Sequence, residues 1–225
     1  MSIGYRIEPR GPAPSPELVD ALRGIPTPIV SDNMGRLYAG GAVLRPFHDG
    51  TPMIGVALTV RTRPGDNLMV HKALDMAQPG DVIVVDAGGE LTNSIFGEIM
   101  LTLARRRRLA GLVIDGAVRD SDALAASSIG VYARGVSHRG PYKDGPGEIN
   151  VAIAIDGMVV EPGDLILGDD DGLLAVPFDA VEAVHAAATQ KAAAEAQQMA
   201  RIAAGTHDAA WVDAALRRLG CAGLA

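Results

Sequence analysis

Short runs of apolar and β-branched residues alternate with helical periodicity over the first two thirds of the chain. Such runs, bounded by turn residues, are typical of buried strands, and they occur at Ile54–Arg61, Val82–Val85, Leu112–Asp115 and Val131–Ala133. Stretches between them with apolar residues every three or four positions predict helices at Asn67–Met76, from about Ser94 to Arg107, and at Ser121–Ser127. This alternation predicts an α/β layered domain.

The two flanks of this region carry different patterns. Ser15 followed by Pro16 and Glu17 predicts a capped helix, and Ser31–Asn33 predicts the opening of a second one. After Asn150 the pattern changes to antiparallel strands, expected at Val151–Ile155, Met158–Val160, Asp164–Leu167 and Leu173–Val176. The sheet is therefore expected to be mixed, not purely parallel.

The C-terminal part predicts two helices, one from Pro177–Asp179 to about Ala204 and one over Asp208–Leu219. The first is rich in alanine and has few large apolar residues, so it is poorly suited to a core of its own. We therefore expect an α/β domain over residues 1–178 and a helical extension over 179–225 that packs on a neighbouring subunit. The chain is expected to form a homo-oligomer.

Composition narrows the class of protein. A formal net charge of −7 with a pI near 5.2 argues against binding to nucleic acid through phosphates. Cys221 is the single cysteine, which excludes an intramolecular disulfide and indicates a reducing compartment. The N-terminus lacks the pattern of a signal peptide, and no apolar run is long enough to span a bilayer. A cytoplasmic protein that does not enter the membrane is expected.

The candidate chemistry lies in two segments, Gly97-Glu98 and Asp115–Asp120. One helix and one strand separate them, so the start of that helix and the end of the next strand can meet in space. In parallel α/β sheets, ligands bind at the carboxyl ends of strands. A zinc-hydrolase signature, a P-loop, a nucleophile elbow and a dinucleotide-binding fingerprint are all absent from the sequence.

These residue types suit a site for a hard cation and an anionic substrate. Asp120 is the expected ligand of Mg²⁺ or Mn²⁺, which often take one or two protein oxygens and keep waters. Arg119 can bind a carboxylate and neutralise charge on an enolate oxygen, and Glu98 can hold a water for proton transfer. Backbone amides near Gly97, Ile99 and Met100 offer an anion site at the helix N-terminus. The alternative is an ordinary surface ion pair beside a first-turn acid.

Several motifs taken together resemble the RraA-like family over most of the chain, from about Asp32 to the long C-terminal helix. They are Gly80-Asp81-Val82, Val84-Val85-Asp86, Phe96-Gly97-Glu98, the segment from Val113 to Asp120, Gly163-Asp164-Leu165 and Asp169–Gly172. The resemblance implies an α-β-β-α sandwich of mixed sheets, assembled as trimers or hexamers with sites between subunits. The family includes metal-dependent 4-hydroxy-4-methyl-2-oxoglutarate and 4-carboxy-4-hydroxy-2-oxoadipate aldolases, which also decarboxylate oxaloacetate, and a regulator that inhibits ribonuclease E.

The resemblance also implies roles for particular residues. Arg119 would bind pyruvate and Asp120 the metal, with Glu98 standing where a family aldolase has aspartate. Glu195 is the nearest match to a family acid that reaches, through water, into the metal site of the neighbouring subunit. Further matches line the family's cleft: Asn67 and His71 on one helical face, and Lys143 for a distal carboxylate. A structural histidine and a solvated lysine are the alternatives for the last two.

The sequence thus predicts a divalent-metal-dependent lyase that cleaves 4-hydroxy-2-oxo acids, or decarboxylates oxaloacetate, through a pyruvate enolate. One alternative is a non-catalytic regulator of ribonuclease E, but the family inhibitor lacks the aspartate that follows the arginine here. Another is a Schiff-base enzyme, although the candidate amines, Lys72, Lys143 and Lys191, lie outside apolar strands. The acidic run Asp169–Asp171 is interpreted as a turn in preference to a metal site.

Overall fold

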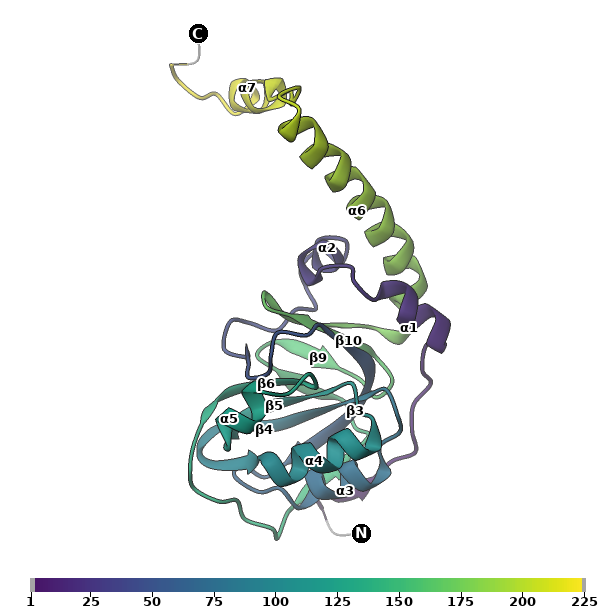
Figure 1. Cartoon of the computed structure of the whole chain (residues 1–225), viewed down its shortest axis with the longest axis vertical. Helices are drawn as coiled ribbons and strands as arrows, with labels where there is room; N and C mark the ends of the chain where they lie inside the picture. Colours follow the sequence, from purple (N-terminus) through teal and green to yellow (C-terminus); the bar gives the residue numbers. More distant parts are fainter. Residues whose placement is uncertain (1–2, 224–225) are drawn as a thin grey trace. The chain divides into compact units, whose positions relative to one another are not determined.

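The computed structural model describes residues 3–223, which are organised around a nine-stranded mixed sheet and a small two-stranded one (Figure 1). The strands are β1 (Tyr5–Ile7), β2 (Arg45–Pro46), β3 (Met53–Thr62), β4 (Asp81–Phe96), β5 (Gly111–Val118), β6 (Gly130–Val136), β7 (Gly147–Ile149), β8 (Ile153–Ile155), β9 (Met158–Val160), β10 (Leu165–Asp169) and β11 (Gly172–Val176). The helices are α1 (Pro16–Leu22), α2 (Thr27–Asp32), α3 (Leu68–Met76), α4 (Glu98–Arg107), α5 (Ser121–Ala125), the short 3₁₀ helix η1 (Phe178–Ala180), α6 (Val181–Ala203) and α7 (Ala210–Arg218).

Four parallel strands, in the order β3-β4-β5-β6, form the centre of the large sheet. Two antiparallel strands share the free edge of β3: β10 pairs with its beginning, over Met53–Val56, and β7 with its end, over Val60–Thr62. The predicted mixed sheet is confirmed. Because β3 to β6 are parallel, their carboxyl ends meet at one edge of the sheet.

Alternating side chains of the central strands build two cores. In β4, Ile83 and Val85 pack with α3 and α4, which lie side by side across that face (Figure 1). Val82 and Val84 point the opposite way and pack with the hairpins β8–β9 and β10–β11. A third core joins the far side of β10–β11 to α1, α2 and the start of α6. The layers therefore follow the predicted order α-β-β-α.

Strand β4 is much longer than the sequence predicted. It continues past Val85, where the predicted strand ended, and reaches Phe96, so the helix expected from about Ser94 begins only at Glu98. Pairing with β5 resumes after each of several register shifts, with Ser94 opposite Ala117 and Phe96 opposite Val118. Residues 94–96 are therefore strand and not helix, because their pairing with β5 outweighs the local helical periodicity.

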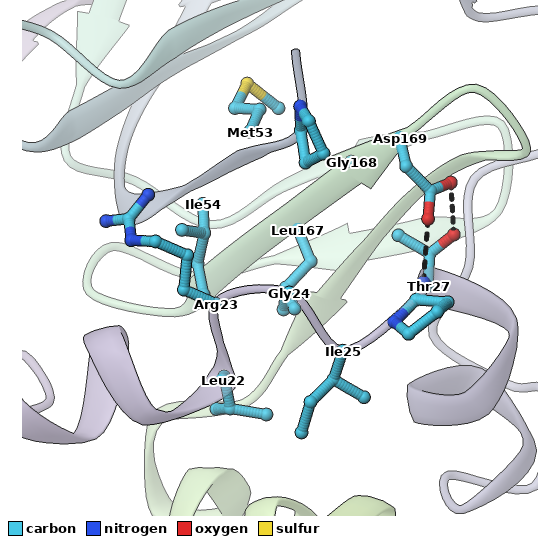
Figure 2. Close-up of a pocket in the computed structure, with 12 residues that line it drawn as sticks. Leu22, Arg23, Gly24, Ile25, Thr27, Met53, Ile54, Leu167, Gly168 and Asp169 are labelled. Carbon is cyan, nitrogen blue, oxygen red and sulfur yellow. Dashed lines mark hydrogen bonds between the residues drawn. The ribbon is translucent and has the colours of Figure 1, made fainter. Parts of the chain in front are cut away.

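The helix expected to open at Ser31 was also placed wrongly, because α2 begins at Thr27 and ends at Asp32. Its start is fixed by Asp169, whose carboxylate accepts hydrogen bonds from the amide (2.9 Å) and the hydroxyl (2.6 Å) of Thr27 (Figure 2). Asp169 also accepts from the amide of Asp171, at 3.0 Å. This confirms the interpretation of the acidic run as a turn.

The adjoining pocket of about 140 Å³ is mainly apolar, and the side chains of Thr27 and Asp169 form hydrogen bonds with each other at its edge.

The chain divides into two compact units, one ending at Ala188 and one beginning at Thr189. The first turns of α6 belong to the first unit, since Val181, Val184 and Ala188 are buried. In the second unit, α7 leaves Trp211 67% exposed. The expected C-terminal helices are present, and their packing on a neighbouring subunit remains a prediction. No helix within residues 3–223 combines the length and hydrophobicity needed to cross a bilayer.

Candidate functional site

A cleft of about 310 Å³ lies where β4 and β5 end. Eight of the residues singled out from the sequence line it: Asn67, His71, Gly97, Ile99, Met100, Arg119, Asp120 and Lys143. The strand pairing explains how segments distant in the sequence meet. Phe96 lies opposite Val118 in the β4–β5 ladder, and the amide of Arg119 donates to the carbonyl of Phe96 at 2.9 Å. The residues that follow these strand ends are therefore neighbours.

Asp120 is held by the first helix turn that follows β4. Its Oδ2 accepts a hydrogen bond from the amide of Glu98 at 2.9 Å, so it caps α4 although it lies on another segment. The backbone of Asp120 is left-handed, with φ of 59°, and its carboxylate lies 3.8 Å from Nε of Arg119. Oδ1 accepts no hydrogen bond from any residue in the range 3–223. One oxygen of Asp120 thus anchors the side chain, and the residue lines the cleft.

Gly97 allows these groups to come this close. A Cβ atom at this position would lie 2.5 Å from Oδ2 of Asp120 and 2.9 Å from Cγ of Arg119. Its backbone is extended, with φ of −165°, so close approach and not conformation requires glycine here. The sequence predicted a role for the amide near Gly97, whereas in the structure the missing side chain matters as much.

The start of helix α3 contributes polar residues to the lining of the cleft. Asn67 precedes the helix and donates from Nδ2 to the carbonyl of Ile95 at 3.1 Å. Its Oδ1 is buried and has no hydrogen-bond partner among the described residues. His71 lies four residues further along and also faces the cleft. Burial, and then the nearby charge of Lys143, lower the pKa of His71.

The charges of the cleft favour an anionic ligand. Arg119 and Lys143 bring two cations and Asp120 one carboxylate, and the amides of the first turn of α4 add partial positive charge. Arg119 and Asp120 are each 41% exposed, so both remain accessible to a ligand. Such a site suits a small carboxylic acid.

Two of the acids predicted for the site are not brought into the cleft. The side chain of Glu98 is exposed and does not line the cleft, although its amide holds Asp120. Glu195 lies in the second unit, exposed, with Oε1 at 3.7 Å from Nζ of Lys191. Its approach to the site of a neighbouring subunit remains a prediction, as does the water assigned to Glu98.

The donor set fits a metal that takes few protein ligands. Within residues 3–223, no group of three or more His, Cys, Asp or Glu side chains is placed to hold an ion. Asp120 offers one free carboxylate oxygen, beside open space for waters and substrate oxygens. Mg²⁺ and Mn²⁺ accept such a site, whereas structural zinc requires four protein ligands.

Some lining residues were not among the predicted site residues. Ser94, Ile95, Phe96 and Pro141 complete the wall. The hydroxyl of Ser94 donates to the carbonyl of Arg139 at 2.8 Å and ties β4 to the loop that carries Lys143. The sequence held no signal for this contact, because Ser94 was expected to begin a helix and its partner is distant.

The layered fold and the Arg119–Asp120 pair at the end of β5 are the features that the RraA-like resemblance predicted. Comparison with known proteins assigns the chain to the same family. The chain belongs to the Aldolase/RraA family, whose RraA-like model matches residues 17–175. A relative in Halalkalibacterium halodurans, named provisionally as a 4-hydroxy-4-methyl-2-oxoglutarate aldolase, is 39% identical over 177 residues, covering 79% of this chain and 84% of its own.

The chain is also similar to a curated protein and to a solved structure from Thermus thermophilus. The first, named as a 4-hydroxy-4-methyl-2-oxoglutarate aldolase, is 38% identical over 112 residues, which cover 50% of this chain and 68% of that one. The solved structure of the RNA-processing inhibitor RraA shares 34% identity with a TM-score of 0.63, covering 68% of this chain and 92% of that one. The family therefore contains proteins named for two kinds of activity.

Proposed function

We propose that this chain is a divalent-metal-dependent aldolase that releases pyruvate from 4-hydroxy-2-oxo acids such as 4-hydroxy-4-methyl-2-oxoglutarate, with oxaloacetate decarboxylase activity. The observation that carries the proposal is the pairing of Arg119 with Asp120, whose Oδ1 is free, in a cleft that favours anions. The relatives named as aldolases support the same reaction class.

Asp120, with waters, would hold Mg²⁺ or Mn²⁺, which when bound polarises the 2-oxo group and its carboxylate. Arg119 would bind that carboxylate and neutralise the negative charge that develops on the 2-oxo oxygen. The first-turn amides of α4, near Gly97, Ile99 and Met100, would complete the anion site. Each of these groups stabilises charge that increases as the reaction proceeds.

In the retro-aldol direction, a water held by Glu98 would accept the proton of the C4 hydroxyl, and C4 becomes a carbonyl. The C3–C4 bond breaks, and its electron pair moves to the pyruvate fragment as an enolate. A water held by Glu98 at the rim of the cleft would return a proton to C3. Decarboxylation of oxaloacetate breaks the corresponding C3–C4 bond, releases CO₂ and leaves the same enolate, so one set of residues serves both reactions.

The complete site would include a second subunit. Glu195 would approach the metal-bound waters of a neighbouring chain, within a homotrimer or homohexamer, as the family resemblance implies. The helical extension beyond residue 178 offers the means, because within the described range its outer part exposes Met199, Ile202 and Trp211. Size-exclusion chromatography with light scattering would give the assembly.

A second candidate function is regulation of RNA processing. The similarity to the T. thermophilus inhibitor favours it, since the two share 34% identity over 68% of this chain. The two functions make different demands on Asp120, because binding to a ribonuclease does not need a free carboxylate in the cleft. The Asp120 variants therefore test one function against the other.

The experiment measures pyruvate released from oxaloacetate and from 4-hydroxy-4-methyl-2-oxoglutarate, with Mg²⁺ and with EDTA. Asp120→Ala should lower kcat/KM by about 100-fold or more. Asp120→Asn keeps an oxygen that can accept from Glu98 and removes the charge, so it separates capping from cation binding. Asp122→Ala removes an exposed acid two residues away and should leave the rate unchanged. Turnover that is insensitive to EDTA and to Asp120→Ala would overturn the proposal.

A further inference from the structure

The carboxylate of Asp66 joins two segments that contribute to the cleft. The residue is fully buried at the end of the turn before α3. Its Oδ1 accepts from the amide of Leu68 at 2.9 Å, which caps α3. Its Oδ2 accepts from the amides of Asp144 (2.8 Å) and Gly145 (2.9 Å), which lie in the loop that carries Lys143. One side chain therefore fixes both the helix and the loop.

Other contacts join the same two segments. The amide of Asn67 donates to the carbonyl of Tyr142 at 3.0 Å, and the amide of Tyr142 donates to the carbonyl of Gly65 at 2.9 Å. Arg63 donates to Oδ2 of Asp66 at 3.1 Å and lies over the Tyr142 ring, 5.2 Å from its centre. The residues on both sides of Lys143 are thus bound, which leaves its own side chain exposed at the cleft.

We propose that Asp66 is a positioning residue that holds Lys143 against α3, so that its ammonium meets the distal carboxylate of a dicarboxylic substrate. This inference rests on the proposed function and adds the residue that positions Lys143 for its substrate. Asp66 itself is fully buried and does not line the cleft, so it acts through the residues that it holds. A substrate without a second carboxylate would gain nothing from this arrangement.

The chain supplies a matched control in Asp164. It is also a buried aspartate that accepts from two backbone amides, those of Glu161 at 2.8 Å and Phe178 at 3.0 Å. None of these three residues lines the cleft. Asparagine keeps one oxygen and turns the other into an amide donor, so either replacement breaks hydrogen bonds to backbone amides, and only in Asp66→Asn do these include bonds to the Lys143 loop. A purely structural role would give both variants the same kinetics.

The kinetic test compares 4-hydroxy-4-methyl-2-oxoglutarate with 4-hydroxy-2-oxopentanoate, which lacks the distal carboxylate. Asp66→Asn should raise KM for the dicarboxylate about tenfold, the effect of losing one charge-assisted contact, and leave kcat and the second substrate nearly unchanged. Lys143→Met should give the same pattern, and Asp164→Asn neither change. Equal increases of KM for both substrates in Asp66→Asn would overturn the proposal.

Two further measurements need no turnover. Hydrogen exchange at the amides of Asp144 and Gly145 should become faster in Asp66→Asn and stay slow in Asp164→Asn. The pKa of His71, lowered by burial and by Lys143, should rise in both Asp66→Asn and Lys143→Met when followed by NMR. Unchanged exchange in Asp66→Asn would overturn the placement of Lys143.

These outcomes separate the inference from the proposed function. A wild-type chain inactive on both substrates would contradict the proposed aldolase, while exchange and the His71 titration would still decide what Asp66 holds. If Asp66→Asn fails to fold, Arg63→Met serves as the milder variant, because it removes one contact to Asp66 and one to Tyr142. It should change KM in the same direction by a smaller factor, and an unchanged KM would contradict the proposal.

Discussion

Replacing Gly97 by alanine would place a methyl group between α4 and the Arg119–Asp120 pair. The new Cβ would lie 2.5 Å from Oδ2 of Asp120, whereas an unstrained contact needs about 3.5 Å. The carboxylate or the helix must therefore move by about 1 Å. A misplacement of that size at a reacting centre lowers the rate by about 100-fold. We expect kcat of Gly97→Ala to decrease by about that factor.

The assay would couple pyruvate release to lactate dehydrogenase, with Mg²⁺ present, and would follow thermal unfolding in parallel. Stability should change by only about 1 kcal/mol, the value of one helix cap, because the extended backbone of Gly97 accepts alanine. Gly135→Ala is the matched control. Its Cβ would meet Leu91 at 3.5 Å, an ordinary contact outside the cleft. Activity of Gly97→Ala within threefold of wild type would refute the assigned geometry.

Three further predictions concern stability. Asp169→Ala removes the side chain that caps α2 and should lower the free energy of unfolding by about 1–2 kcal/mol, measured by urea titration; an equal loss in Asp170→Ala, an exposed neighbour, would contradict this assignment. Leu112→Ala empties a fully buried position in the core and should cost about 2–5 kcal/mol, whereas Leu103→Ala, 42% exposed, should cost much less. Burial and a neighbouring lysine lower the pKa of His71, so the unfolded chain binds this proton more readily near its usual pKa of about 6.5. The neutral His71 therefore contributes its full stability above that pH, and the free energy of unfolding decreases as the pH falls below it. His71→Gln should flatten this part of the plot of unfolding free energy against pH, and an unaltered plot would refute the assignment.

The central strands and helices were predictable because their signals are local. Buried apolar runs such as Leu112–Asp115 formed strands, and Ser15 caps α1 as expected, with its hydroxyl oxygen accepting from the amide of Leu18. The Arg119–Asp120 segment was singled out for the same reason, since it follows directly on a buried strand. The structure places both residues in the cleft.

What the sequence did not reveal depends on contacts between distant segments. The start of α2 is set by Asp169, whose position relative to Thr27 is fixed only by the fold. The extension of β4 past Asp86 depends on partners in β5, which the sequence of that segment does not reveal. Asp66 was not among the site residues predicted from the sequence, and its link to Asp144 became visible only in the structure.

The hydrogen bond that joins Asp120 to α4 has a consequence for affinity. A flexible side chain that becomes a ligand must give up its rotamer freedom when the ligand binds, which weakens binding. Here folding has already imposed that loss, because the amide of Glu98 fixes the carboxylate before anything enters the cleft. A single carboxylate so preorganised can therefore retain a cation for which a mobile one would be too weak.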